Sequence, residues 1–151
     1  MSLLFRNRQY QVPSPLWPLD GRSERPRPVI HVTVIGPAAT ELKEGLLDTG
    51  SDDTVFPDHM AASLGIDLTN APRGTARGVG GPGRAVRYAE VQLRITDGRE
   101  FREWKAKVGF TSTPLNRPLL GFSGFLQFFT ATFHGDREEV ELTVNSRYRG
   151  T

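Results

Sequence analysis

The chain has 151 residues, 37% of them hydrophobic, which suits a single domain with one core rather than two. Its formal net charge is only +2, so the high isoelectric point of about 9.3, which comes from 16 arginines, gives no strong case for nucleic-acid binding. The absence of cysteine excludes disulfides, thiolate nucleophiles and cysteine-bound zinc.

Residues 1–28 predict an N-terminal arm or extension rather than part of the core. Residues 12–28, VPSPLWPLDGRSERPRP, are rich in proline and arginine, which favours an extended arm. Residues 5–10, FRNRQY, interleave aromatic and cationic side chains as nucleic-acid binders can, but a pairing strand explains them equally well. We expect a cytoplasmic protein, because the sequence has no signal-peptide pattern and no apolar stretch long enough to span a membrane.

In the rest of the chain, apolar and polar residues mainly alternate with a period of two. This pattern predicts an all-β domain over residues 29–145, followed by a short tail at 146–151. Residues 29–36 predict one strand, residues 86–110 predict two long strands around an Asp97-Gly98 turn, and residues 129–144 predict a further hairpin. Short helices are expected at 57–65, ending at Gly65, and at 123–129.

The segment LLDTGSDDTVFP, residues 46–57, places three carboxylates directly after two leucines. A strand ending at Leu47 would bring Asp48 to a partly desolvated position, and Thr49, Gly50 and Ser51 can form a tight turn that holds its carboxylate. When two such carboxylates share one proton, one acts as a general acid while the other activates water.

Three segments in order resemble the retropepsin-like aspartic proteases. LLDTGSDDT (46–54) is similar to the catalytic signature, ARGVGGPGRAVRYAEVQLRI (76–95) resembles the glycine-rich flap hairpin, and RPLLGFSGFL (117–126) resembles the apolar-apolar-glycine element before the C-terminal helix. The resemblance implies a closed barrel of the acid protease fold with one or two short helices, a homodimer, and hydrolysis of peptide or protein substrates without metal or cofactor.

The resemblance also assigns roles to individual residues. Asp48 would be the catalytic carboxylate, Thr49 would brace the paired loops across the dimer axis, and Gly50 would let the substrate backbone approach. Asp52 and Asp53 would offer acceptors to peptide N–H groups along the cleft. The flap tip that closes over substrate would consist of Gly78, Val79, Gly80 and Gly81. Gly121 would pack against the catalytic loop.

The chain departs from the retroviral pattern at Phe122, where those members have an arginine that pairs with the first aspartate after the catalytic turn. Asp52 therefore lacks its expected partner. Arg117, Arg6 and Arg8 are the candidates to replace that arginine, and the sequence does not choose among them.

Other interpretations of these segments remain open. Asp-Thr-Gly is often an ordinary turn, Asp52 and Asp53 suit solvated turn charges, and GVGGPG suits a flexible loop. Three other functions are not favoured. A metal site is not, because His59 has no partner at metal-ligand spacing, and a serine nucleophile is not, because the GFSGF segment lacks the final glycine of that motif. The spacing of the aspartates is wrong for a phosphatase. The same fold can also serve as a catalytically silent module for dimerisation or peptide binding.

The sequence holds one Asp-Thr-Gly and no second Asp-[Thr/Ser]-Gly. A shared site would therefore take its second carboxylate from an identical subunit related by two-fold symmetry. The terminal segments 3–12 and 140–145 alternate as pairing strands do and are the candidates for the interface.

Overall fold

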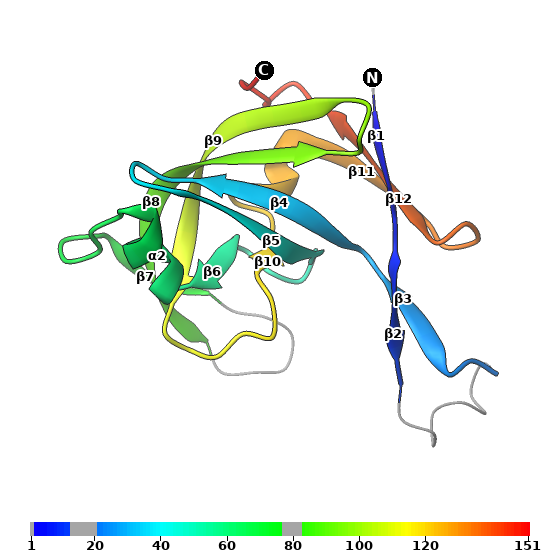
Figure 1. The fold of residues 1–151 in the computed structure, drawn as a ribbon, viewed down its shortest axis with the longest axis horizontal. Coiled ribbons are helices and arrows are strands. Elements are labelled where there is room, and N and C mark those ends of the chain that lie inside the picture. Colours follow the sequence, from blue (N-terminus) through cyan, green and yellow to red (C-terminus); the bar gives the residue numbers. More distant parts are fainter. Residues whose placement is uncertain (1, 13–20, 77–82) are drawn as a thin grey trace.

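The computed structural model describes residues 2–12, 21–76 and 83–151 as a β-rich domain (Figure 1). Its strands are β1 (Leu3–Arg6), β2 (Arg8–Gln11), β3 (Glu24–Arg27), β4 (Val29–Ile35), β5 (Thr40–Leu47), β6 (Val55–Pro57), β7 (Arg73–Ala76), β8 (Arg84–Thr96), β9 (Phe101–Thr111), β10 (Leu119–Leu120), β11 (Phe129–His134) and β12 (Glu139–Val144). Helical structure in these ranges is limited to α2 (His59–Leu64) and the 3-10 helix η2 (Leu126–Phe128). The prediction of a mainly β fold is confirmed, with one short α-helix among the described residues.

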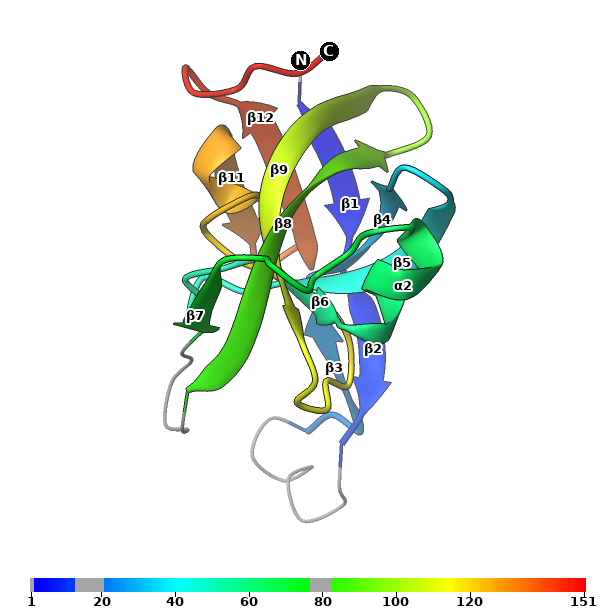
Figure 2. The same cartoon turned by 90° about the vertical axis from the view of Figure 1, so that its left-hand side faces the viewer.

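Six strands of the main sheet close into a ring. The sheet has the order β4-β5-β10-β6-β9-β8-β7, and an additional pairing between β4 and β8 completes the ring, leaving β7 attached to β8 outside it. The long hairpin of β8 and β9 curves along one side of the domain, as the two perpendicular views show (Figures 1 and 2). The predicted Asp97-Gly98 turn joins these two strands, with Thr96 opposite Phe101 and a positive φ of 90° at Gly98.

Strand β10 inserts between β5 and β6 and thereby brings two distant parts of the chain together. It runs parallel to β5, with Leu119 opposite Leu46 and Leu120 opposite Leu47. Gly45 makes this approach possible, because a Cβ there would lie 2.7 Å from Cγ of Leu120. The ends of β5 and β10 therefore lie side by side, and each leads into a loop.

The core is built from the period-two pattern of the long strands. Val32 and Val34 of β4 and Leu93 and Ile95 of β8 are all buried. Trp104 of β9 packs edge-on against neighbouring aromatic rings, and its indole N–H donates to a backbone carbonyl at 2.9 Å. Burial of these side chains supplies the main driving force for closing the ring.

The N-terminal segment contributes to two smaller sheets. Strand β1 pairs with β12, which also pairs with β11, so the predicted hairpin within 129–144 is confirmed. Strands β2 and β3 form a two-stranded arm that projects away from the ring (Figure 1). The described part of this arm has no fully buried residue, as expected for a segment outside the core.

The two expected helices differ in outcome. Helix α2 ends at Gly65, whose φ of 82° forms the predicted left-handed terminator. The helix expected at 123–129 is reduced to the single 3-10 turn η2, and Phe129 already belongs to β11. The positive φ of 91° at Gly124 and the parallel bridge between Ser123 and Asp53 hold the start of this segment in a non-helical conformation.

Candidate active site

Asp48 lies directly after β5, at the point where that strand and β10 end together. Leu47 is buried and Asp48 is half-buried, as the apolar run before it predicted. The Asp48 N–H donates to the carbonyl of Leu120 at 3.1 Å, and the carboxylate oxygen Oδ1 accepts the N–H of Gly50 at 2.9 Å. The carbonyl of Asp48 also accepts the N–H of Ser51 at 3.2 Å. The Gly50 amide thus holds the carboxylate, and the Ser51 amide closes the turn on the Asp48 backbone.

The loop after Asp48 is braced by the segment that follows β10. Phe122 donates its N–H to the carbonyl of Ser51 at 3.0 Å, and Ser123 donates to the carbonyl of Asp52 at 2.9 Å. Gly121 sits so close that a Cβ there would lie 2.5 Å from the Ser51 carbonyl oxygen. The expected packing of Gly121 against this loop is confirmed, and it makes the position of Asp48 depend on residues seventy positions further along the chain.

The other residues predicted around Asp48 are arranged unequally. Thr49, Gly50 and Asp52 are exposed, whereas Asp53 is half-buried. The interpretation of Asp52 as a solvated turn charge is compatible with this exposure, because its carboxylate remains in water. Asp53 instead points toward the sheet and has a partner there.

None of the arginines considered for Asp52 pairs with its carboxylate among the described residues. The guanidinium of Arg117 lies over the ring of Tyr10, 4.4 Å from its centroid. Arg8 forms an ion pair with Glu44. Within the same described ranges, no hydrogen bond or ion pair joins Arg6 to Asp52. None of the three candidate arginines therefore replaces, as a partner of Asp52, the arginine that retroviral members have at the position of Phe122.

Asp53 accepts a hydrogen bond from the phenol of Tyr88, with 2.9 Å between the phenol oxygen and Oδ2 of the carboxylate. Burial, together with the hydrogen bond and the negative charge of Asp53, raises the pKa of Tyr88 to about 12. Sequence reasoning missed this contact. The available signal was the alternation of β8, which puts Val86 and Tyr88 on one face and Arg87 on the other.

Of the segment predicted to form the flap, the structure describes only the two flanking strands. Strands β7 and β8 pair antiparallel, with Thr75 opposite Ala85, as the two sides of a hairpin do. The predicted tip lies outside the described residues: Gly78, Val79, Gly80 and Gly81.

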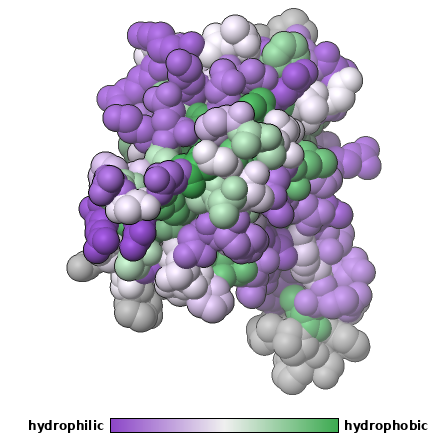
Figure 3. Space-filling view, turned by 60° about the vertical axis from the view of Figure 1, so that its left-hand side comes forward, coloured by the Kyte–Doolittle hydropathy of each residue, from purple (hydrophilic) through white to green (hydrophobic). Residues whose placement is uncertain are grey.

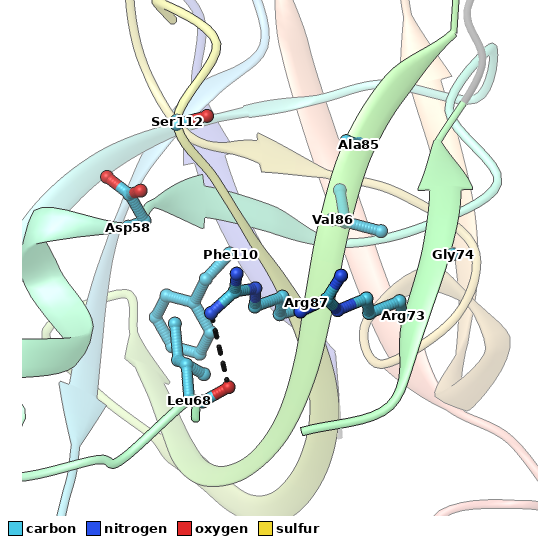
Figure 4. A pocket seen from close by; sticks show the side chains of 9 residues that line it. All are labelled: Asp58, Leu68, Arg73, Gly74, Ala85, Val86, Arg87, Phe110 and Ser112. Carbon is cyan, nitrogen blue, oxygen red and sulfur yellow. Dashed lines mark hydrogen bonds between the residues drawn. The ribbon is translucent and has the colours of Figure 1, made fainter. Parts of the chain in front are cut away.

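A separate pocket of about 370 Å³ opens beside β7 and β8 (Figure 4). Arg73 and Arg87 extend into it above Leu68 and Phe110, and Nη1 of Arg87 lies 3.4 Å from the Leu68 carbonyl. Asp48 does not line this pocket. The pocket therefore lies apart from the loop that carries the candidate carboxylate.

Comparison with known families agrees with this geometry. Residues 30–123 match the family model described as aspartyl protease, which is a retropepsin-like family. The chain therefore belongs to the aspartyl protease family. The matched region contains the Asp48 loop and extends through the glycine that braces it. A search of curated proteins found no match to the chain.

Two further observations concern the described residues alone. No group of three or more histidine, aspartate or glutamate side chains is arranged there to hold a metal ion. No helix within the same ranges is long and apolar enough to cross a membrane.

Proposed function

We propose that the chain is an aspartic endopeptidase that hydrolyses peptide bonds with water activated by two Asp48 carboxylates, one from each subunit of a homodimer. The observation that carries this proposal is the half-buried Asp48, held at the end of β5 by backbone amides and braced by the segment after β10. Membership of the aspartyl protease family supports the reaction class.

The reaction follows from two carboxylates that share one proton, as aspartic proteases do. The ionised Asp48 removes a proton from water while the water oxygen attacks the peptide carbonyl carbon. The protonated Asp48 of the partner subunit donates its proton to the carbonyl oxygen, which gives a tetrahedral intermediate. The Asp48 that took the proton from water then passes it to the amide nitrogen, while the Asp48 of the partner subunit takes a proton from a hydroxyl of the intermediate. The C–N bond breaks, and the pair of carboxylates again shares one proton. No covalent bond to the protein forms.

Several neighbouring residues support this arrangement. The exposed Thr49 and Gly50 are available to a partner loop and to a substrate backbone. Phe122, with 54% of its surface exposed, stands beside the same loop. An apolar side chain exposed at this place suits a subunit interface. The face drawn in Figure 3 is mainly hydrophilic, and its hydrophobic side chains appear in small separate areas.

The terminal strands are also available for assembly, but in a particular way. Within one subunit β1 already pairs with β12, and β12 pairs with β11. A second subunit would therefore add to the outer edge of β11, or to the part of the outer edge of β1 that Asp97 does not occupy, rather than insert between β1 and β12. We infer that the loops around Asp48 and Phe122 provide the central contact and the strand edges extend it.

A catalytically silent peptide-binding module is the alternative, and Phe122 favours it. This residue replaces the arginine of the retroviral pattern, and Asp52 has gained no other arginine among the described residues. A loop held less firmly would bind a peptide without placing both carboxylates on one water.

Cleavage of an unfolded protein at mildly acidic pH separates the two functions. The intact chain should produce peptides, and Asp48→Asn should produce none, because the amide cannot take a proton from water. Asp136→Asn is the matched control, since Asp136 is exposed in the distant turn between β11 and β12. Unfolding and sedimentation measurements should show that both variants keep their fold and assembly. Equal cleavage by the chain and by Asp48→Asn would refute the proposed site.

A further inference from the structure

Tyr88 contacts the loop that carries Asp48, from a strand that lies far from Asp48 in sequence. It comes from β8, on the same face as Val86, and its hydroxyl donates to Oδ2 of Asp53 at 2.9 Å. Asp53 follows Asp48 by five residues in the same loop. One of the two carboxylate oxygens of Asp53 is therefore hydrogen-bonded to a residue of the protein itself.

Gly74 leaves room for the Tyr88 ring. A Cβ at Gly74 of β7 would lie 2.6 Å from the ring and 2.8 Å from its hydroxyl oxygen. Gly109 of β9 stands opposite Tyr88 in the sheet, and a Cβ there would lie 3.6 Å from the ring. The absence of a side chain at Gly74 leaves room for the phenol, whereas a Cβ at Gly109 would only touch the ring at an ordinary contact distance. The room beside Gly74 lets the ring take the orientation that brings its hydroxyl to Asp53.

The surroundings of this hydrogen bond are apolar. Val55, two residues after Asp53, forms a small buried cluster with Ala76 and Val86, separate from the main core. Tyr88 and Leu115 pack against it. The carboxylate of Asp53 thus stands at the border of an apolar wall, and the phenol covers the side of the carboxylate that faces β8.

We propose that Tyr88 determines specificity in the cleft beside Asp48: by holding Asp53 against the apolar wall, it makes the adjoining subsite select an apolar substrate side chain over a basic one. This inference rests on the proposed function. A carboxylate with both oxygens open would attract a lysine or arginine side chain, through a charge-assisted hydrogen bond. The hydroxyl of Tyr88 competes with such a cation for the Asp53 carboxylate and keeps that carboxylate directed toward β8.

The test compares matched peptides that differ at one position, leucine in one and lysine in the other, scanned along the positions near the scissile bond. In Tyr88→Phe, kcat/KM for the lysine peptide relative to the leucine peptide should rise about tenfold at one position, the effect of freeing one charged acceptor. Adding Asp53→Asn to that variant should abolish the rise, because the amide no longer attracts a cation. Gly74→Ala should shift selectivity in the same direction, because it displaces the ring while keeping the hydroxyl.

Tyr148→Phe is the matched control. Its hydroxyl also donates to protein oxygens, the carbonyls of Glu103 and Thr151, but it lies away from the Asp48 loop. This variant should keep the selectivity of the unchanged chain. An identical preference profile in Tyr88→Phe and in the unchanged chain would overturn the inference.

Binding measurements separate this inference from the proposed reaction. On an Asp48→Asn background, which cannot hydrolyse the peptides, the affinities for the leucine and lysine peptides should show the same dependence on the Tyr88 hydroxyl. Equal affinity ratios with and without that hydroxyl would refute the role of Tyr88, whether or not the chain cleaves. Failure of the unchanged chain to cleave, with the affinity ratios shifted as expected, would refute only the proposed hydrolysis. The Cζ resonance of ¹³C-labelled Tyr88 should also move in Asp53→Asn, which checks the contact directly.

Discussion

Replacement of Asp97 by asparagine tests how the N-terminal strand is joined to the ring. The Asp97 side chain is only 1% exposed, in the turn between β8 and β9. Its oxygen Oδ1 accepts the N–H groups of Arg99 and Glu100, each at 2.9 Å, and Oδ2 accepts the N–H of Leu4 in β1 at 3.1 Å. The carboxylate therefore occupies part of the outer edge of β1. Asparagine keeps the shape but removes the charge.

The magnitude of the loss follows from the pKa of Asp97. Burial alone would raise this pKa, but the hydrogen bonds from the N–H groups of Glu100, Arg99 and Leu4 outweigh it and lower the pKa from 3.8 to about 2. Such a difference between unfolded and folded chains is worth about 2 kcal/mol of stability. Because the folded pKa is the lower one, this stability is fully present above the unfolded value and is lost as the pH falls through about 2.

The assay is urea unfolding at a fixed protein concentration, since a dimer unfolds in a concentration-dependent way. At pH 7 the Asp97→Asn variant should be less stable than the unchanged chain by about 2 kcal/mol, and the difference should shrink as the pH falls from 4 toward 2. Asp67→Asn serves as the control, because Asp67 also accepts hydrogen bonds in a turn but is exposed. Equal stability at pH 7, or a difference that persists at pH 2, would refute this account of Asp97.

Three further predictions concern the site. Gly121→Ala should lower the free energy of unfolding by about 1–3 kcal/mol and reduce cleavage, because its Cβ would overlap backbone oxygens of the Asp48 loop. Gly135→Ala is the control, because no atom lies within 4 Å of its Cβ. Thermal unfolding and cleavage assays should show no change in this control. The rate of cleavage should follow a bell-shaped pH profile confined to acid or weakly acidic conditions, since the two Asp48 carboxylates lose their protons in two steps, and a rate that climbs above neutrality would count against the pair. Specific activity should fall on dilution, and equal mixing with Asp48→Asn chains should leave about one dimer in four with both carboxylates; a fully active monomer in the ultracentrifuge would contradict a shared site.

The local features of the fold could be predicted from the sequence. The turn at Gly98, the helix terminator at Gly65 and the alternation along 86–110 each depend on backbone preferences and hydrophobic period within a few residues. The position of Asp48 after the apolar end of a strand belongs to the same class. These features carry their cause within the segment itself, so a single sequence was enough to find them.

The helix expected at 123–129 shows where local reasoning fails. Its residues permit a helix, but the bridge from Ser123 to Asp53 and the packing of Phe125 and Phe129 around Trp104 favour a single 3-10 turn followed by a strand. The competing contacts come from residues far away in the chain. Tertiary packing therefore overrides a weak local preference.

The sequence by itself determined that Asp48 stands in a tight turn after a strand that ends in two leucines, within a β-rich chain of the aspartyl protease pattern. The tertiary structure decided what surrounds that turn: the insertion of β10 beside β5, the hydrogen bond from Tyr88 to Asp53, and the link from Asp97 to β1. The partners in each of these contacts are separated by 35 residues or more, and their meeting depends on strand register and on closure of the ring. A period-two pattern states which face a side chain takes, but not which strand lies opposite it, and that choice is made only when the whole sheet assembles.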